Sequence, residues 1–517
     1  MKQVLLLLML IFSGMSFRQF FGNTAVAEDF SIRGGNMLRW ARGESSVQGV
    51  GETAQEEWFE NVTNVSLAYR DLQLGMRHSL FRPSEFGEEQ GGIEAIDFKY
   101  LEYRYSNLTL TAGNFYASIG RGLAFNLYED YSLNFDSNLE GVKAEYSDDR
   151  VGALAFRGRS YPSTSPEGSR VRENDVEGMM LKINPLYNSS LAGYYLYVPA
   201  ESYPETRMPG GFAQFNVAGV GLYAESVLQF VQDGSEDPYY GNYLALDYTF
   251  AGLGILADYK DYNFKKYGTY SSGGITSSEP LAYQNPPLVQ REFTTNLLAK
   301  HPHVPVYNDE VGFQIEVNGQ ISEPLALTLN FSRSSLHRGG SVIPSLHEED
   351  APFWQLFLEG EFDFPAGHFL RLDLGANEEV LVTGPKDARI TFFWQRKQAA
   401  SLEGTYYLEN QYGVTGHFEA MRLEDVVLDD EYFEFYSALT LSRAPWGSAT
   451  VSVENTFNPQ QIEQDVWVGG EMDLNFLKHH NLLLFVGQDR GGMKCTSGRC
   501  RYVDPFEGVK LTWRTTF

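Results

Sequence analysis

Long hydrophobic runs are almost absent from this chain, and their absence excludes a membrane protein built from spanning helices. Only Val4–Phe12, near the start, is continuously apolar, and a spanning helix needs roughly 20 such residues. The 517 residues nevertheless include 31 tyrosines and 36 phenylalanines, and the mean hydropathy is −0.30. Abundant aromatic side chains without apolar blocks argue against a series of separate globular domains.

Cysteine is equally scarce, because Cys495 and Cys500 are the only two in the chain. They enclose the sequence TSGR, in which Gly498 permits a tight reversal. In an exported protein a disulfide between them is expected, and closing so short a loop shapes a turn more than it stabilises a fold. A zinc site needs further ligands nearby, and a thioredoxin-like motif has two intervening residues, so both alternatives are remote.

The start of the chain has the layout of a secretory signal. Lys2 precedes the apolar run, and the small residues of Ala25-Val26-Ala27 follow it. The run is too short for a membrane anchor. We therefore predict a signal peptide over residues 1–27 and a single domain over residues 28–517.

Acidic residues outnumber basic residues in this chain, with 67 Asp and Glu against 40 Lys and Arg. Without Lys2 and Arg18, the mature protein would keep 38 basic and 67 acidic residues, a formal charge of −29. This balance excludes nucleic acid as a partner, because neutralising its backbone needs a surplus of lysine and arginine. Cations or metal-bridged surfaces are the natural partners. An equally good explanation is that acidic loops keep an exported protein soluble.

The recurring signal is alternation with a period of two. In residues 324–333, leucines and a phenylalanine occupy the odd positions, and small or polar residues occupy the even ones. Residues 242–250 alternate in the same way. Successive side chains of a strand point to opposite faces, so these segments are two-faced strands. The charged residues Asp247, Arg371 and Asp373 lie on polar faces and are candidates to line a lumen.

Short and long connections alternate along the chain. The segments at 147–149, 322–324 and 365–367 are very short, and longer stretches rich in Gly, Ser and Pro lie between them. This asymmetry, with two-faced strands of roughly 10 residues, is typical of outer-membrane barrels. Lipid leaves no backbone group unpaired, so the sheet must close. The predicted fold is all-β, a transmembrane antiparallel barrel in the bacterial outer membrane.

We expect about 24 strands, within a range of 22–26 and with an even number. The alternation is inconsistent between residues 397 and 430, so one strand there is wrongly assigned. Strand-like pattern begins at about Asp29, so no separate plug domain is expected before the first strand. The longest expected loops are Phe264–Gln290, Ser334–Ala351, Arg42–Glu60 and Ser160–Asn174.

The final strand has one apolar face and one basic or hydroxylated face. Trp513 and Phe517 lie on the apolar face, which is expected to contact lipid, and Lys510 and Arg514 lie on the face expected to line the lumen. This ending resembles the terminal strand of bacterial outer-membrane barrels, whose final aromatic residue is read by the barrel assembly machinery. The resemblance implies that Trp513 and Phe517 act as an assembly signal.

Residues 112–136 begin as a strand and then break where two glycines flank Arg121. The break would let the chain fold into the lumen, with Arg121 facing Glu129 or Asp130. Opposed charges on an inward loop are how channels build a constriction. An extracellular loop with a local salt bridge explains the pattern equally well.

Catalytic motifs are not recognisable in the sequence. No nucleophile elbow, zinc-protease motif, P-loop or dinucleotide fingerprint occurs. His301 and His303 lie in a Pro-interrupted stretch, and His337 and His347 bracket another loop, which is followed by Glu348, Glu349 and Asp350. Solvated loops explain these histidines better than metal sites. We expect no enzyme, cofactor or metal, although barrel enzymes gather catalytic groups from different strands.

Residues 113–130 (GNFYASIGRGLAFNLYED) and 495–500 (CTSGRC) resemble a family of large, functionally uncharacterised, porin-like Gram-negative outer-membrane barrels. The resemblance spans the mature chain and implies barrel and location, but no catalytic residues.

Three functions are compatible with these patterns. The first is a porin-like channel for passive or weakly selective diffusion of small solutes, biased toward cations or neutral molecules. The alternative is a structural or accessory barrel for secretion, surface assembly or adhesion, with a lumen filled by loops and Phe264–Gln290 docking a partner. A barrel enzyme is the third. Outer-membrane lipid, the assembly machinery and small solutes are the expected partners; the sequence does not indicate an oligomeric state.

Overall fold

The computed structural model describes residues 30–46, 53–85, 93–133, 135–160, 174–186, 188–201, 203–235, 237–272, 275–279, 281, 283–383, 391–408, 411–426, 430–459, 464–496 and 498–517. The predicted signal peptide and most of the Ser160–Asn174 loop lie outside these residues.

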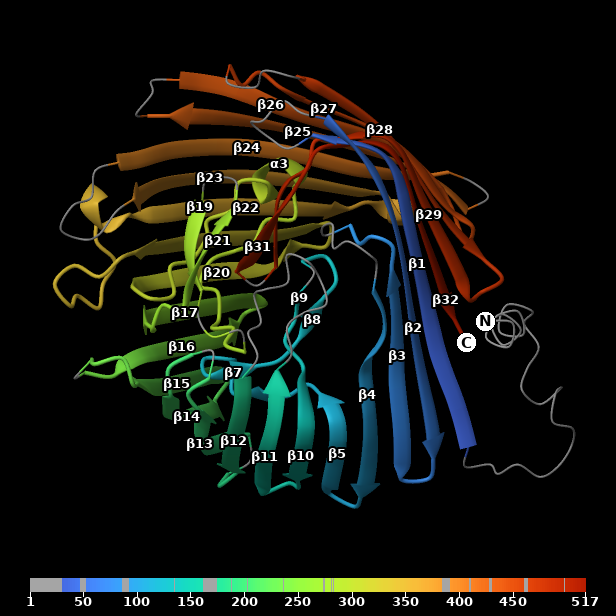
Figure 1. The fold of residues 1–517 in the computed structure, drawn as a ribbon. Helices are drawn as coiled ribbons and strands as arrows, with labels where there is room; N and C mark the ends of the chain where they lie inside the picture. The colour runs from blue at the N-terminus through green and yellow to red at the C-terminus, as the bar shows by residue number, and fades with distance from the viewer. Residues whose placement is uncertain are drawn as a thin grey trace, which may run out of the picture.

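Twenty-four antiparallel strands form one closed sheet, which confirms the predicted barrel (Figure 1). Each strand pairs with the next along the wall, and β32 pairs with β1 to complete the ring. The strands are β1 (Phe30–Ser46), β2 (Thr53–Tyr69), β3 (Leu72–Phe81), β4 (Ile93–Tyr105), β5 (Leu108–Phe115), β10 (Leu139–Ser147), β11 (Val151–Ser160), β12 (Asn174–Ile183), β13 (Ser189–Val198), β14 (Thr206–Val217), β15 (Val220–Val231), β16 (Tyr239–Phe250), β17 (Leu253–Asn263), β20 (Glu310–Ser322), β21 (Leu325–Ser335), β22 (Phe353–Asp363), β23 (Phe369–Thr383), β24 (Thr391–Tyr407), β25 (Tyr412–Asp425), β26 (Asp430–Arg443), β27 (Gly447–Thr456), β28 (Val466–Phe476), β29 (His480–Asp489) and β32 (Phe506–Thr516).

The remaining elements are short and lie in the connections between wall strands. Most of them belong to segments inside the barrel (Figure 1). They are β6 (Ser118–Ile119), β7 (Phe125–Asn126), β8 (Glu129–Asp130), β9 (Phe135–Asp136), β18 (Gly268–Ser272), β19 (Ile275–Glu279), α3 (Asn296–Ala299), η1 (Glu348–Asp350), η2 (Pro365–Gly367), β30 (Gly492–Thr496) and β31 (Arg499–Val503). No helix among the described residues is long and apolar enough to span a membrane.

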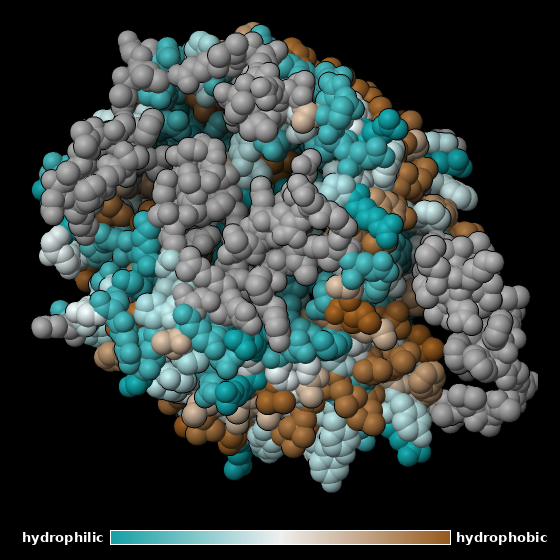
Figure 2. Space-filling model, viewed as in Figure 1, coloured by the Kyte–Doolittle hydropathy of each residue, from teal (hydrophilic) through white to brown (hydrophobic). Residues whose placement is uncertain are grey.

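The outer face of the wall is apolar. In β12, Met179 and Leu181 are 60% and 57% exposed, whereas Val176, on the opposite face, is fully buried. Similar exposed leucines, valines and tyrosines recur on strand after strand. Figure 2 shows apolar side chains gathered over the outside of the wall at the lower edge of the view. A continuous apolar exterior on a closed sheet is the lipid-facing surface of an outer-membrane-type barrel.

Connections at the two ends of the barrel differ as predicted. At one end the turns have two to five residues, and they include the expected short connections near 148, 323 and 366. At the other end every connection has six or more residues, except the four-residue connection between β25 and β26. All the segments that enter the barrel start from the long-connection end.

Two strand assignments need correction. Residues Arg42–Glu60 are not one long loop, because β1 continues to Ser46 and β2 begins at Thr53. The ambiguous region between 397 and 430 contains the ends of β24 and β26 and all of β25. β24 has 17 residues, well above the length that crosses a hydrocarbon core.

Candidate functional site: a plug folded into the barrel

Three connections fold into the barrel and pack against one another. We call residues 116–138 the first plug segment, residues 264–309 the second plug segment and residues 490–505 the plug hairpin (Figure 1). The backbone N–H of Asn126 donates to the Tyr283 carbonyl at 2.7 Å, which joins the first two segments. Arg499 of the hairpin donates to the Gln284 carbonyl at 2.8 Å, so all three form one plug.

The first plug segment packs on the inner wall through apolar side chains. Phe125 is fully buried and stacks on Phe156 of β11, with ring centroids 4.4 Å apart. Ile119 and Leu123 are also fully buried in the same cluster. The inner faces of β11–β17 contribute Leu154, Val176, Tyr194, Leu196, Met208, Tyr223, Val227, Tyr243 and Tyr262. This wall therefore has an apolar inner face as well as an apolar outer face, which the alternation did not indicate.

Arg121 lies in the barrel, but its predicted partners are wrong. Its guanidinium lies 4.4 Å from the ring of Tyr223 and donates to the Tyr243 hydroxyl at 2.9 Å. Its backbone N–H donates to the Glu225 carboxylate at 2.8 Å. The glycines on either side have φ values of +57° and +94°, a backbone that turns Arg121 toward β15 and β16.

Glu129 and Asp130 lie on the other side of the first plug segment. Glu129 accepts a 2.7 Å bond from Arg77 of β3, and Arg77 also lies 3.4 Å from Asp136. Asp130 accepts from the backbone N–H and hydroxyl of Ser132 and shapes a local turn. The predicted constriction pair is therefore replaced by two separate attachments, one to β15–β16 and one to β3.

The second plug segment carries His303 into a buried ionic site. Its Nδ1 lies 2.6 Å from Glu379 of β23 and its Nε2 lies 3.3 Å from Glu310 of β20, while the ring stacks on Phe353. Burial disfavours the charged imidazole, but the facing carboxylates outweigh burial and raise the pKa of His303. The expectation of a solvated loop histidine is wrong here, because the loop folds inward.

The helix α3 is fixed to β25 by one carboxylate. Glu419 accepts bonds from the backbone N–H groups of Asn296 and Leu297, at 2.9 and 2.8 Å. These donors have no partner within a helix, so a carboxylate there satisfies them and matches the helix dipole. Leu297 and Leu298 then pack against Met421 and other side chains of the wall.

A further ionic cluster joins the second plug segment, the plug hairpin and the wall. Arg490 bonds to Glu434 of β26 at 2.5 Å and to Glu454 of β27 at 3.0 Å. Lys300 shares Glu454 at 2.5 Å, and His301 lies 3.3 Å from Glu434. Burial lowers the pKa of His301, despite this bond. The plug thus reaches walls on opposite sides of the barrel.

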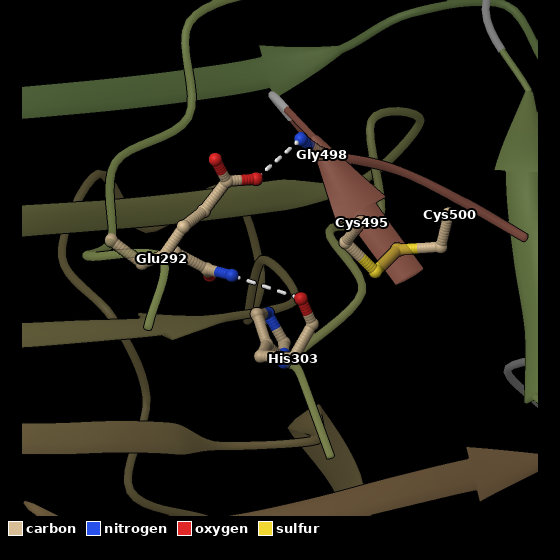
Figure 3. Close-up of a disulfide and its surroundings, with 6 residues drawn as sticks. Glu292, His303, Cys495, Gly498 and Cys500 are labelled. Atoms are coloured by element: carbon tan, nitrogen blue, oxygen red, sulfur yellow. Dashed lines mark hydrogen bonds between the residues drawn. A yellow bond between two sulfur atoms is a disulfide. The ribbon is translucent and has the colours of Figure 1, made fainter. Parts of the chain in front are cut away.

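The two cysteines form the predicted disulfide, at the tip of the plug hairpin (Figure 3). The hairpin lies within the plug, because the backbone N–H of Gly498 donates to Glu292 at 3.1 Å. Gly498 has a φ of +77° and lies against Tyr307, Leu288 and Pro305, so a side chain there would be both strained and crowded. The disulfide shapes a turn, as expected, but that turn is buried among plug residues.

The other residues predicted to line the lumen, Asp247, Arg371 and Asp373, lie on the inner face of the wall. Arg371 is 3.4 Å from Asp373 and 3.3 Å from Glu403 of β24. Asp247 lies on the same face of β16 as the buried Tyr243. A role for these residues in permeation stays a prediction.

The apolar end of β32 also lies where it was predicted to close the sheet. The backbones of Phe517 and Gly34 exchange two hydrogen bonds at 2.9 and 3.0 Å. Trp513 pairs with Leu38 in the register between β32 and β1. Their role as an assembly signal stays a prediction.

Several residues that hold the plug were not singled out from the sequence. Glu225, Glu419 and Glu434 occupy inner positions of β15, β25 and β26, in a chain with 67 acidic residues. Their partners lie more than a hundred residues away for Glu225 and Glu419, so no local pattern could identify them. Within the described part of the chain, no group of three or more His, Cys, Asp or Glu side chains is arranged so that it could hold a metal ion.

Residues 1–192 match the family of unknown function DUF6029, which supports the predicted resemblance to an uncharacterised family. No curated protein sequence is similar to this chain. The translocation pore of the P pilus usher PapC is similar over 94% of this chain and 99% of its own, at 11% identity and a TM-score of 0.46.

Two Pseudomonas aeruginosa proteins show a weaker similarity in structure. OpdK, solved with vanillate, matches 72% of this chain and 98% of its own at 12% identity and a TM-score of 0.38. OccK5 (OpdH) matches 73% of this chain and 99% of its own at 10% identity and a TM-score of 0.37. With TM-scores below 0.5, none of these similarities transfers a cargo or a partner to this chain.

Proposed function

We propose that this protein is a gated channel of the bacterial outer membrane, with its own connections as the gate. The observation that carries the proposal is a closed 24-stranded wall whose lumen holds a plug built from three loops. Barrels of 16 to 18 strands already leave an aqueous channel, so a larger ring without a plug would be open. Passage through this barrel therefore depends on the position of the plug.

The wall is complete without the plug. Every wall strand pairs with two neighbouring wall strands, and the plug supplies none of these pairings. Displacing the plug breaks side-chain contacts and a few backbone bonds, and it leaves the sheet intact. A gate of this kind moves without unfolding the barrel.

Charges on the inner wall favour cations or neutral solutes. Arg291 of the second plug segment lies 3.1 Å from Glu316 and 3.2 Å from Glu359. Arg371, beside this pair, contacts Asp373 and Glu403. Four carboxylates of β20, β22, β23 and β24 thus face two arginines, of which Arg291 belongs to the plug and Arg371 to the wall. An excess of negative charge in a lumen attracts cations and repels anions.

Planar-bilayer recordings test the gate. We expect the intact protein to be closed for most of the time. A variant in which residues 265–308 are replaced by a short Gly/Ser linker is expected to give large, discrete conductance steps. A second variant, E225A with E434Q, keeps the full chain and should open more often than the intact protein. Plug-less barrels that fold, as judged by heat-modifiable migration in gels, and still pass no current would overturn the proposal.

Reversal potentials in a salt gradient test the cation bias. The triple variant E359Q/D373N/E403Q should lose cation preference. The matched control is E177Q, which removes a carboxylate from the outer face, where Met179 is exposed. An equal selectivity change in both variants would contradict a role for the inner carboxylates.

A structural or accessory barrel is the second candidate, and the span of the plug favours it. Ionic contacts reach β3 on one side and β25–β27 on the other. However, Phe264, Leu281 and Tyr283 are buried inside the barrel, so this part of Phe264–Gln290 offers no outer docking surface in this state. Silent plug-less barrels, together with co-purification of a partner, would favour this second candidate.

A further inference from the structure

The loop of residues 336–352, between β21 and β22, has a defined internal structure. We call it the rim loop. The N–H of Leu336 donates to the Asp350 carbonyl at 2.8 Å, and the Ser345 hydroxyl donates to the Asp350 carboxylate at 2.6 Å. The Ser345 N–H donates to the Ser335 hydroxyl at 2.7 Å, and the Ser345 hydroxyl accepts from the His347 N–H at 3.1 Å. The side chains that the loop presents are therefore held in place.

The rim loop lies over the outside of the wall. The Tyr259 hydroxyl donates to the Val342 carbonyl at 2.8 Å, and Arg333 donates to the Ser345 carbonyl at 3.0 Å. Tyr259 alternates with Lys260, which bonds to Glu310 inside the barrel. Since neighbouring side chains of a strand point to opposite faces, Tyr259 points outward.

The side chain of Arg333 also points out of the barrel. It alternates with Ser334, whose hydroxyl lies 3.5 Å from His303 of the plug. Arg333 therefore faces out, next to Trp354, its partner in the register between β21 and β22. His337 fixes the start of the loop by lying between Asp261 and Asp309, at 2.9 and 2.8 Å. The rim loop thus contacts outward-facing side chains of two strands.

Three large apolar side chains of the rim loop are directed away from the protein. Val342, Ile343 and Leu346 are 60%, 69% and 76% exposed. One exposed apolar residue on a surface is ordinary, but three within five positions form a patch. This patch adjoins the outer face where Tyr259 of β17, Phe313 of β20 and Trp354 of β22 lie at the same level, with Arg333 of β21 between the last two.

We propose that Val342, Ile343 and Leu346 insert into the outer leaflet and anchor the rim loop in the hydrocarbon of the membrane. Lipid is the expected partner of this patch, because the patch is continuous with the apolar face that the wall presents to lipid. Aromatic residues of outer-membrane barrels concentrate where hydrocarbon meets headgroups, and these side chains lie beside such a girdle. The proposal depends on the barrel lying in a membrane and not on channel activity.

Depth-sensitive spin labelling tests this anchor. The native cysteines are paired with each other, so I343C adds a single free thiol to the protein. Reconstituted in phospholipid vesicles, a nitroxide at 343 should collide more often with oxygen than with a water-soluble nickel complex. L244C, on the lipid-facing side of β16, gives the lipid reference. S235C, exposed in another long connection, gives the aqueous reference.

Each outcome of the labelling decides for or against the proposal. A collision profile at 343 like that of the 244 label supports lipid insertion, and one like the 235 label overturns it. Dipolar broadening between labels of different molecules, with poor access to both reagents, would identify a second copy of the chain as the occupant and also overturn it. The triple variant V342S/I343S/L346S should keep heat-modifiable migration, since the loop lies outside the sheet, and should make the loop accessible to protease.

Discussion

The first plug segment is attached to β11–β16 by a large apolar cluster, whereas the second plug segment and the plug hairpin are attached to β20–β27 by several buried ion pairs beside a smaller apolar cluster. Phe125 on Phe156 represents the first kind of attachment, and Arg490 between Glu434 and Glu454 represents the second. Both occur in one lumen, on opposite sides of the plug.

The two attachments respond differently to conditions. Apolar burial is independent of pH, and it is lost only when the side chain is removed or the packing is broken. Buried ion pairs are strong only while both partners are charged and hydrogen-bonded. A gate built from these contacts should therefore release first on the β20–β27 side.

Removing the Phe125 ring should give the largest effect. F125A leaves a cavity beside Phe156 and should destabilise the first plug segment by about 3–5 kcal/mol. Hydrogen-exchange protection of the amides of residues 118–133 measures the change. L186A, in an exposed turn, is the control and should leave those amides unaffected. If F125A lowers the stability of the first plug segment by less than about 1 kcal/mol, the apolar contacts do not hold this segment in place.

Neutralising Glu434 should have the next largest effect, confined to the other side of the plug. E434Q weakens the bonds to Arg490 and His301, and hydrogen bonds to charged groups are worth about 2–3 kcal/mol. Exchange of the hairpin amides should accelerate, with the first plug segment unchanged. E431Q removes an exposed carboxylate of the same strand and should change little. If amide exchange accelerates equally in the first plug segment and in the plug hairpin, the two attachments are not independent.

Opening the disulfide should have a smaller effect. C495S/C500S frees a loop of six residues, and the constraint on so short a loop is worth about 2 kcal/mol. The barrel should still fold and show heat-modifiable migration. Only the amides of the plug hairpin should exchange faster. A barrel that fails to assemble would show that the hairpin is needed earlier, during folding.

Raising the pH should have the smallest effect, on the second plug segment alone. The pKa of His303 is raised, so its stabilising contribution is complete below the unfolded value of about 6.5 and is lost as pH rises through the folded value. Glu379 and Glu310 face the ring, with Lys260 and Lys397 beyond them and Ser334 alongside. Burial lowers the pKa of His301, so His301 loses its charge at a lower pH than His303 does.

Protection factors of residues 296–303, corrected for intrinsic exchange, measure this dependence between pH 6 and pH 9. H303Q should remove the dependence while leaving the first plug segment as protected as before. A dependence that persists in H303Q would assign it to another group.

Alternation, together with the sequence of short and long connections and the apolar final strand, was enough to predict the barrel. The period-two pattern of β16, β21 and β27 is local, since each side chain's direction follows from its neighbour, and lipid contact on one face keeps that face apolar. The disulfide also followed from the sequence, because only two cysteines exist. The strand boundaries between residues 397 and 430 could not be predicted from alternation, and that region holds the end of the 17-residue β24, all of β25 and the start of β26.

The sequence by itself thus determined the class of fold, its closure and its lipid-facing side. Only the tertiary structure decided which connections enter the lumen, because a loop that folds inward has the same glycines, serines and prolines as one in solvent. Arg121 acquired Glu225 as its partner across 104 positions, and Leu297 acquired Glu419 across 122. Such contacts depend on where the closed wall brings distant residues together, and neither spacing nor composition encodes that position.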